Sequence, residues 1–521
     1  MRHNSHIAEA INFHQIGLLE KAEEIYLKVL KVEPQNSDLF NLMGVIAYQR
    51  NQLETAFDFF NQAIAINPNV SSYHSNRGAV YKQRGQFLEA MENYKTAIFL
   101  DPKSAEIYTN LSAIQIELGQ LEEAISNCET AIFHKPEFAE AYYNRANAYK
   151  KMHKYELALD SYEKSIALKP TYVQAYYNMG NLFQEFLQLP SAIKSFNEAI
   201  RLSPEYPEPH LNSSICKLLC GSLIEGWELY EWRWKTKELI GASRNFIQPF
   251  WLDGECLKGK TILLHAEQGL GDTIQFCRYV KLIVDLGAKV IIEVQRPLVK
   301  ILTNFAGVTT LIAQGDPVPD FDYHCPLLSL PLAFKTDINS IPNPHQYLIA
   351  EPSRVALWKD RLGSDSFKIG ISWQGSTGPG AKGRSFNLAQ LVKIAHLPNV
   401  QLISLQKGYG SEQMQNLPFG MKVLDLGDAL DADGAFLDTA AVMKNLDLVI
   451  SCDTAVVHLA GALGVKTWVA LKFVPDWRWM LDRTDSPWYP SLTLYRQEVA
   501  GEWGPVFDKM RQDLIAEFQN K

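Results

Sequence analysis

Proline recurs every 34 residues through the first part of this 521-residue chain, at Pro34, Pro68, Pro102, Pro136, Pro170 and Pro204. Twelve residues before each proline stands an alanine, at Ala22, Ala56, Ala90, Ala124, Ala158 and Ala192. Four residues after each alanine stands a larger side chain, at Tyr26, Phe60, Tyr94, Cys128, Tyr162 and Phe196. Small and large side chains at fixed spacing let two helices pack closely. A period of this length is typical of stacked helix–turn–helix units.

This pattern resembles the tetratricopeptide repeat family over about residues 5–235. The resemblance implies an N-terminal all-α superhelix, and we assign about six repeats and a divergent capping repeat to residues 1–238. In the last unit Gly226 replaces the alanine, and tryptophans enter at Trp227, Trp232 and Trp234. Such divergence is expected of a terminal repeat, which must cap the array or dock onto the next domain.

Bulk properties set limits on the class of protein. A chain of this length exceeds one hydrophobic core, so we expect several domains. A net charge of −8 does not indicate the basic surface that a nucleic-acid-binding protein needs. Met1–Gly17 is polar and follows the repeat, so we expect no signal peptide, and no apolar run approaches the ~20 residues of a transmembrane helix. Seven cysteines without a CxxC pair fit a reducing compartment, and the expected location is cytoplasmic.

The pattern changes after Pro249 to alternating strands and helices. Lys260–Ala266 and Lys289–Val294 read as strands around an amphipathic helix at Thr273–Leu286, which is a βαβ unit. Residues 315–350 are expected to hold loops and short strands around one more helix. Further strands are expected at Phe367–Trp373, Val400–Leu405, Lys422–Leu426, Asp447–Ser451 and Lys466–Leu471.

The predicted fold class is therefore α plus α/β, with two Rossmann-like lobes at 245–360 and 361–521. In such sheets ligands bind at the carboxyl ends of the strands.

Three glycine-containing motifs follow predicted strands. Glu267–Asp272 (EQGLGD) ends in an aspartate that either acts chemically or only caps a helix. Ser451–Gly464 (SCDTAVVHLAGALG) opens a helix, whose N-terminus can bind a phosphate. There the alternative makes Asp453 and Thr454 caps and His458 a core residue. Ile371–Ser385 is a polar, cationic loop that suits an anionic ligand or is only a surface loop.

Together these stretches resemble the heptosyltransferase-like glycosyltransferases over about residues 258–515. The resemblance implies the GT-B fold and inverting, metal-independent transfer from a nucleotide-sugar, with no cofactor. It makes Asp272 the catalytic base. It assigns nucleotide-sugar binding to a set of residues in the second lobe, Arg384, Lys407, Asp453, Thr454, Ala455 and His458. Arg384 departs from the family, which has a lysine nearby, and Ala455 replaces a usual glycine.

A closer similarity is to bacterial proteins that join tetratricopeptide repeats to such a domain. It rests on five blocks, Trp227–Trp234, Glu267–Phe276, Ser404–Gly408, Asp476–Trp479 and Ser486–Tyr489.

The chemistry of an inverting transfer needs few groups. A carboxylate takes the proton of the acceptor hydroxyl, and Asp272 is the candidate. Charge grows on the leaving phosphate, where the helix start at Thr454–Ala455 and the Arg384 guanidinium can stabilise it without Mg²⁺. The acidic stretch Asp425–Asp438 fails as an EF-hand, because the frame set by Gly434 puts alanine where acidic residues are needed.

Asparagine also recurs every 34 residues, at Asn76, Asn110, Asn144, Asn178 and Asn212. Such a column on the concave face could hydrogen-bond an extended peptide, because each carboxamide both donates and accepts. A similar column occurs in protein O-GlcNAc transferases; alternatively, asparagine here helps the turn between helices. We therefore expect a protein acceptor held by the repeats. The other hypotheses are a lipid-linked or polysaccharide acceptor and a non-catalytic scaffold.

Overall fold

The computed structural model describes residues 2–241, 244–252, 254–378 and 382–519. It divides into two compact units, Met1–Leu182 and Phe183–Lys521. The predicted boundaries at 238 and 360 stay predictions, but the second unit contains the last helix pairs as well as the α/β part. Residues 379–381, within the predicted cationic loop, lie outside the described residues.

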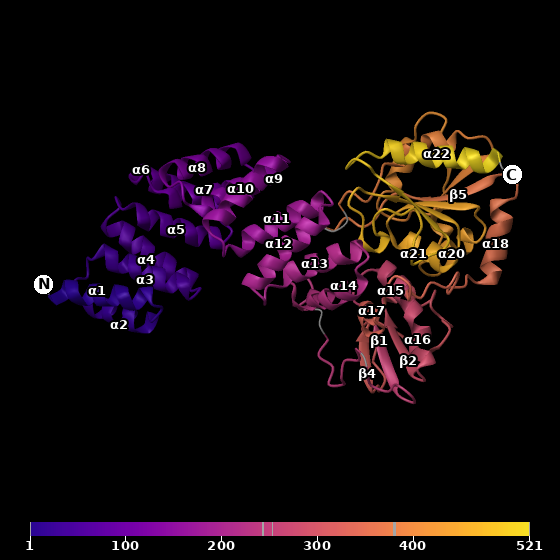
Figure 1. Cartoon of the computed structure of the whole chain (residues 1–521), viewed down its shortest axis with the longest axis horizontal. Helices are drawn as coiled ribbons and strands as arrows, with labels where there is room; N and C mark the ends of the chain where they lie inside the picture. Colours follow the sequence, from indigo (N-terminus) through magenta and orange to yellow (C-terminus); the bar gives the residue numbers. More distant parts are fainter. Residues whose placement is uncertain (1, 242–243, 253, 379–381, 520–521) are drawn as a thin grey trace. The chain divides into compact units, whose positions relative to one another are not determined.

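The first unit is a series of helix–turn–helix pairs, seen in indigo and purple in Figure 1. Its helices are α1 (Arg2–Gln15), α2 (Leu19–Leu30), α3 (Ser37–Gln49), α4 (Leu53–Ile66), α5 (Ser71–Gln83), α6 (Phe87–Leu100), α7 (Ala105–Glu117), α8 (Leu121–His134), α9 (Ala139–Lys151), α10 (Tyr155–Leu168) and most of α11 (Val173–Glu185). Helices of one repeat pack on each other and on the next repeat.

The recurring small and large residues form the core of these repeats, as predicted. All six alanines of the pattern are 0% exposed, and their six larger neighbours are at most 1% exposed. The contact between the helices of one pair is close: a Cβ on Gly44 would lie 2.6 Å from the Phe60 ring. A larger residue at this position would therefore force the two helices apart.

The second unit begins with the end of α11 and three more helices, α12 (Leu189–Leu202), α13 (Pro207–Leu219) and α14 (Leu223–Tyr230), and the 3-10 helix η1 (Glu231–Lys235). Two parallel sheets follow. The first has the order β3-β2-β1-β4. Its strands are β1 (Thr261–His265), β2 (Lys289–Val294), β3 (Val308–Ala313) and β4 (Tyr323–Pro326). Its helices include α15 (Leu270–Phe276), α16 (Val280–Asp285) and α17 (Leu330–Ala333).

The second sheet has the order β10-β9-β8-β5-β6-β7 and is also parallel throughout. Its strands are β5 (Phe367–Ser372), β6 (Val400–Ser404), β7 (Val423–Leu424), β8 (Leu448–Cys452), β9 (Thr467–Leu471) and β10 (Leu492–Arg496). Its helices include α18 (Pro352–Leu362), α19 (Val392–Ala395), α20 (Leu437–Met443), α21 (Ala455–Ala462) and α22 (Gly504–Gln519). The prediction of parallel sheets after a helical repeat array is confirmed.

Buried side chains of both sheets explain the strand pattern. In β5 and β8 every position after the first is buried, as expected of central parallel strands covered on both faces. On one face, Phe507, Met510 and Leu514 of α22 join the core cluster of the second sheet, which includes Ile369 and Ile450. This packing fixes the carboxyl ends of the strands, from which the loops of the candidate site arise.

Candidate functional site

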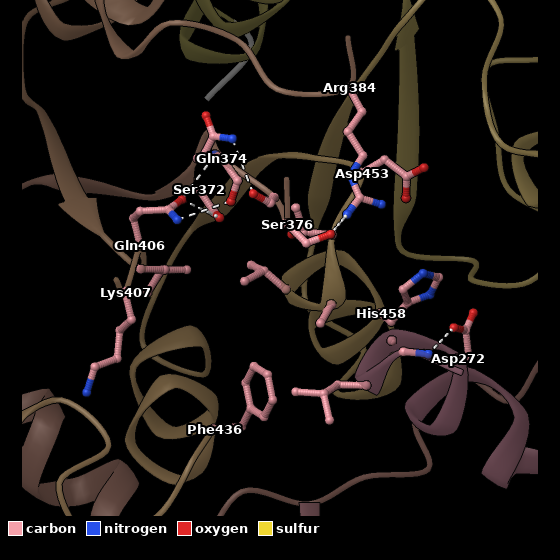
Figure 2. A pocket seen from close by; sticks show the side chains of 18 of the residues that line it. Asp272, Ser372, Gln374, Ser376, Arg384, Gln406, Lys407, Phe436, Asp453 and His458 are labelled. Atoms are coloured by element: carbon pink, nitrogen blue, oxygen red, sulfur yellow. Dashed lines mark hydrogen bonds between the residues drawn. The ribbon is translucent and has the colours of Figure 1, made fainter. Parts of the chain in front are cut away.

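A pocket of about 940 Å³ lies within the second unit, between the turn after β1 and the loops that follow β5, β6 and β8 (Figure 2). The turn contributes Gln268–Asp272. The other loops contribute residues that the sequence singled out, Arg384, Lys407, Asp453, Thr454, Ala455 and His458. All seven candidate residues of the α/β part therefore line one pocket, although they come from segments far apart in the sequence.

Asp272 lies in the first turn of α15, where both of its carboxylate oxygens accept hydrogen bonds. One oxygen accepts from the backbone N–H of Gly269 at 2.7 Å, which is a helix cap. The other accepts from Nη2 of Arg478 at 2.5 Å. The side chain is 19% exposed and borders the pocket. The capping interpretation is therefore correct for one oxygen, and Asp272 is also a residue that lines the cavity.

Arg478 is a site residue that the sequence analysis did not assign. It lies in the 3-10 helix η9 (Trp477–Trp479) and binds Asp476 at 2.9 Å as well as Asp272. Its Nε donates to Gln275 at 2.7 Å. The only sequence signal was the block Asp476–Trp479, because a partner 206 residues away in the chain leaves no local pattern.

Gly271 allows the starts of α15 and α21 to meet. A Cβ on Gly271 would lie 2.7 Å from the His458 ring and 3.4 Å from the Cα of Ala455. The first N–H groups of a helix have no partner inside it, and the start of α21, with Thr454, Ala455 and Val456, borders the pocket. This arrangement provides partial positive charge for an anionic ligand.

His458 is buried and its Nδ1 lies 2.9 Å from the hydroxyl of Tyr489. Its ring stacks on Trp479. Burial, and then the charge of Arg478, hold the pKa of His458 well below its usual value, so the imidazole is neutral at physiological pH. These contacts favour the packing role for His458, although the residue also borders the pocket.

Arg384 and Thr454 both lie next to Gly375, in the glycine-containing loop after β5. Arg384 donates from Nη2 to the Ser376 hydroxyl at 2.7 Å. A Cβ on Gly375 would lie 2.9 Å from Nε of Arg384 and 3.2 Å from the Thr454 methyl. Gly375 therefore lets a guanidinium approach the start of α21, which is suitable for binding phosphate oxygens.

Asp453 precedes this helix and shares the pocket wall with Asp476. Burial, and then the nearby Asp476 carboxylate, raise the pKa of Asp453 to about 6. The charges of Arg478 and Arg384 oppose that shift. A raised pKa favours the protonated carboxyl group, which can donate as well as accept a hydrogen bond.

Gln406 connects the loops after β5 and β6. Its Oε1 accepts from the backbone N–H groups of Trp373 and Gln374 at 3.2 and 3.1 Å. Its Nε2 donates to the Gln374 carbonyl at 3.1 Å. The neighbouring Lys407 is exposed, and its ammonium donates to the carbonyl of Leu430. Gln406, which the sequence analysis did not assign, is thus a loop-fixing residue beside the predicted ligand-binding lysine.

Aspartates of the acidic stretch Asp425–Asp438 form hydrogen bonds to protein groups nearby. Asp431 accepts from the N–H groups of Asp438 and Thr439 at 2.7 and 2.9 Å. Asp438 in turn accepts from Trp358 and Arg354. Asp431 therefore caps the N-terminus of α20, and Asp438 bonds α20 to α18.

The asparagine column bonds one repeat to the preceding one. Asn76 donates to Asn41 Oδ1 at 2.8 Å, and Asn178 donates to the Tyr143 hydroxyl at 2.9 Å. Asn144 donates to the Thr109 carbonyl at 3.0 Å and to the Ser112 hydroxyl at 3.1 Å. At these positions the amide nitrogen supports repeat stacking rather than the turn between helices, so an acceptor peptide would have to be held through the amide oxygen. Asn110 is half-buried. Asn212 belongs to the second unit, and its side chain or backbone also has an interaction partner.

Comparison with known proteins assigns the repeats. Models described as tetratricopeptide repeat match residues 7–71, 139–172 and 173–206, and one described as TPR repeat matches 78–116 and 114–153. Residues 7–71 and 78–206 therefore match tetratricopeptide repeats, a fold that supports protein-interaction scaffolds. No helix among the described ranges is both long and apolar enough to cross a bilayer.

One curated relative is Protein FlbA of Caulobacter vibrioides, 27% identical over 323 residues that cover 57% of this chain and 53% of FlbA. The chain thus spans about half the length of that relative.

Solved structures match part of the chain. MamA is 24% identical with a TM-score of 0.29, covering 32% of this chain and 92% of its own. PilF of Pseudomonas aeruginosa is 20% identical with a TM-score of 0.35, covering 40% of this chain and 93% of its own. A tetratricopeptide repeat protein of Parabacteroides merdae is 17% identical with a TM-score of 0.39, covering 46% of this chain and 96% of its own.

Proposed function

We propose that the second unit is an inverting GT-B glycosyltransferase that uses a nucleotide-sugar donor and needs no metal ion. The observation that supports this most is that Asp272 and a separate cationic surface line the same pocket. Asp272 comes from the first lobe, and Arg384 and the start of α21 come from the second. An acceptor hydroxyl and a diphosphate leaving group need these two kinds of group on opposite sides of the sugar.

In the proposed reaction the acceptor oxygen attacks the anomeric carbon while the bond to the diphosphate oxygen breaks. The hydroxyl proton moves to the Asp272 carboxylate, which keeps free lone pairs because two oxygens offer about four acceptor positions. The charge that develops on the leaving diphosphate is stabilised by Arg384 and by the N–H groups at Ala455 and Val456. These donors supply the stabilisation that a Mg²⁺ ion provides in other transferases.

The acceptor in this proposal is a protein hydroxyl, presented by a peptide bound to the repeats in the cytoplasm. The tetratricopeptide repeats support this choice, because arrays of this kind present extended concave binding surfaces. The asparagine column would contribute its amide oxygens to the peptide N–H groups.

A nucleotide panel tests the donor site. At about 100 times its dissociation constant, a bound nucleoside diphosphate adds about 2.7 kcal/mol to the stability, which a melting curve resolves. We expect one nucleotide to shift the melting temperature of the wild type and to shift that of Arg384→Ala much less. Arg483→Ala is the matched control, because Arg483 pairs with Asp485 and is not a lining residue of the pocket. Absence of a shift from every nucleotide would refute the donor site.

The asparagine column is tested by replacing Asn110, Asn144 and Asn178 together with alanine. We expect poorer use of a protein acceptor with donor hydrolysis unchanged, and a loss of stability of about 0.5–1.5 kcal/mol for each inter-repeat hydrogen bond removed. Asn127→Ala is the control, because Asn127 donates to Gln115 within the repeats but lies outside the column. Acceptor use equal to that of the control variant would rule out peptide binding by the column.

A further inference from the structure

We propose that the last repeat is part of the transferase site, because Arg233 of η1 positions the turn that carries Asp272. The inference rests on the proposed function in one respect, the role of Asp272 as base. Arg233 follows α14 within the second unit, so the repeat segment and the α/β part belong to one compact body here. Arg233 is a positioning residue in this account and touches no substrate.

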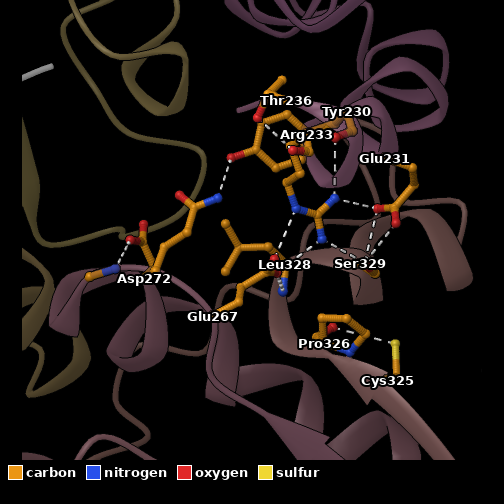
Figure 3. A network of polar contacts seen from close by, with 12 residues as sticks. Tyr230, Glu231, Arg233, Thr236, Glu267, Asp272, Cys325, Pro326, Leu328 and Ser329 are labelled. Carbon is orange, nitrogen blue, oxygen red and sulfur yellow. Dashed lines mark hydrogen bonds and ion pairs between the residues drawn. The ribbon is translucent and has the colours of Figure 1, made fainter. Parts of the chain in front are cut away.

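Arg233 is 1% exposed and uses all of its donors (Figure 3). Nε and Nη2 each donate to one oxygen of Glu267 at 2.9 Å. The other N–H groups donate to Glu231 at 2.6 Å, to the Tyr230 carbonyl at 3.2 Å and to the Ser329 hydroxyl at 2.7 Å. Five bonds match the five N–H groups of a guanidinium, so the group has one fixed orientation.

Glu267 is the first residue of the turn that leads to Asp272, and its side chain is 2% exposed. One of its oxygens also accepts from the backbone N–H of Leu328 at 3.2 Å. Burial raises the pKa of Glu267, while Arg233 opposes that shift and favours the carboxylate. Without Arg233 a buried carboxylate would lack its counter-ion, and the turn would have to move towards water.

The next residues of the turn are held in the same way. Gln268 donates from Nε2 to the hydroxyl of Tyr230 at 3.2 Å. Its backbone carbonyl accepts from Gln295 at 2.8 Å. The N–H of Gly269, one residue on, is the cap that binds the first oxygen of Asp272. Tyr230 and Arg233 therefore anchor both residues that precede this cap.

The second oxygen of Asp272 depends on the same repeat by another route. Arg478 binds that oxygen, and its guanidinium lies 4.2 Å from the ring centre of Trp477. Trp477 packs edge-on against Trp227 of α14, with ring centres 5.1 Å apart. Trp227 is itself fixed, since its Nε1 donates to the carbonyl of Thr336 at 3.0 Å. Both oxygens of Asp272 are thus oriented by contacts that begin on the last repeat.

Hydrogen exchange on the full-length protein tests this positioning without any substrate. In Arg233→Met, which keeps the stem but loses all five donors, we expect amides of residues 267–272 to exchange roughly a hundredfold faster, because removing one partner of a buried ion pair is strongly destabilising. Exchange in the central strand β8 should stay as in the wild type. Arg84→Met is the control, because Arg84 also stacks on an aromatic ring, Phe57, and pairs with a glutamate, Glu54, within the first unit.

Uniform acceleration across the second unit would overturn the proposal, because it would make Arg233 a general stabiliser. No acceleration in residues 267–272 would overturn it as well, because Arg233 would then not hold this turn. Glu267→Gln is the second variant in case Arg233→Met does not fold; it keeps an acceptor for Arg233 and should accelerate the same segment to a smaller extent. Once a donor is known, Arg233→Met should lower kcat and leave the KM for the donor unchanged. If Asp272→Asn keeps its turnover, the proposed role of Asp272 as base fails, yet the exchange result still decides whether the last repeat holds this turn.

Discussion

Replacing Asp272 by asparagine is expected to lower sugar transfer by roughly 10²–10⁴-fold, the usual contribution of a general base. Asparagine keeps the size of the side chain and an oxygen that can accept from Arg478 or from Gly269. Arg478 also retains Asp476 as its counter-ion, so the fold and nucleotide binding should persist. The measurement is turnover of the donor that the nucleotide panel identifies, with a melting curve of the variant.

Asp322→Asn is the matched control for that experiment. Asp322 also accepts a backbone hydrogen bond, from Thr261 at 2.8 Å. It precedes β4 and lies beside the start of β1, whereas Asp272 follows the end of β1. It should leave turnover unchanged. Equal turnover in Asp272→Asn and in the wild type would remove Asp272 as the base.

Replacing Gly461 by alanine is expected to lower the free energy of unfolding of the second unit by about 1–3 kcal/mol, the range for overpacking a core. A Cβ at this position would lie 2.3 Å from the ring of Tyr489. That ring is fully buried, and moving it would break the contact between its hydroxyl and His458. Chemical denaturation measures the loss as a lower midpoint.

Gly504→Ala gives the comparison. A Cβ there would meet no heavy atom within 4 Å among the described residues, and Gly504 also lies in a helix, α22. Alanine should be neutral or slightly stabilising at this position, because it has the higher helix propensity. A midpoint for Gly461→Ala that matches the wild type would contradict the packing described for α21.

The periodic and continuous patterns of the sequence predicted most of the fold. The repeats follow from small and large residues at fixed spacing, and β2 coincides with the predicted strand because central parallel strands are continuous apolar runs. β3 and β10 were not predicted. Both are edge strands in which apolar and polar residues mix, so neither produces such a run.

The candidate site was predictable where it follows strand ends. Asp453 comes directly after β8, and Asp272 follows β1 across a short turn, so each lies beyond the carboxyl end of a buried parallel strand in its own sheet. The contacts that decide their chemistry were not predictable. Arg478 binds Asp272 across 206 residues, and Gly461 accommodates the ring of Tyr489, which comes from another segment of the chain. The asparagine column was visible, but its partners lie one repeat earlier.

The central claim, transfer of a sugar to a protein, is tested most directly by incubating the full-length protein with a panel of radiolabelled nucleotide-sugars and a cell lysate. The account predicts that one donor labels material that is degraded by protease, that EDTA leaves the labelling intact, and that Asp272→Asn abolishes it. Label confined to lipid or polysaccharide would contradict the protein acceptor. No transfer from any donor would contradict the transferase itself and leave the chain a repeat-based scaffold.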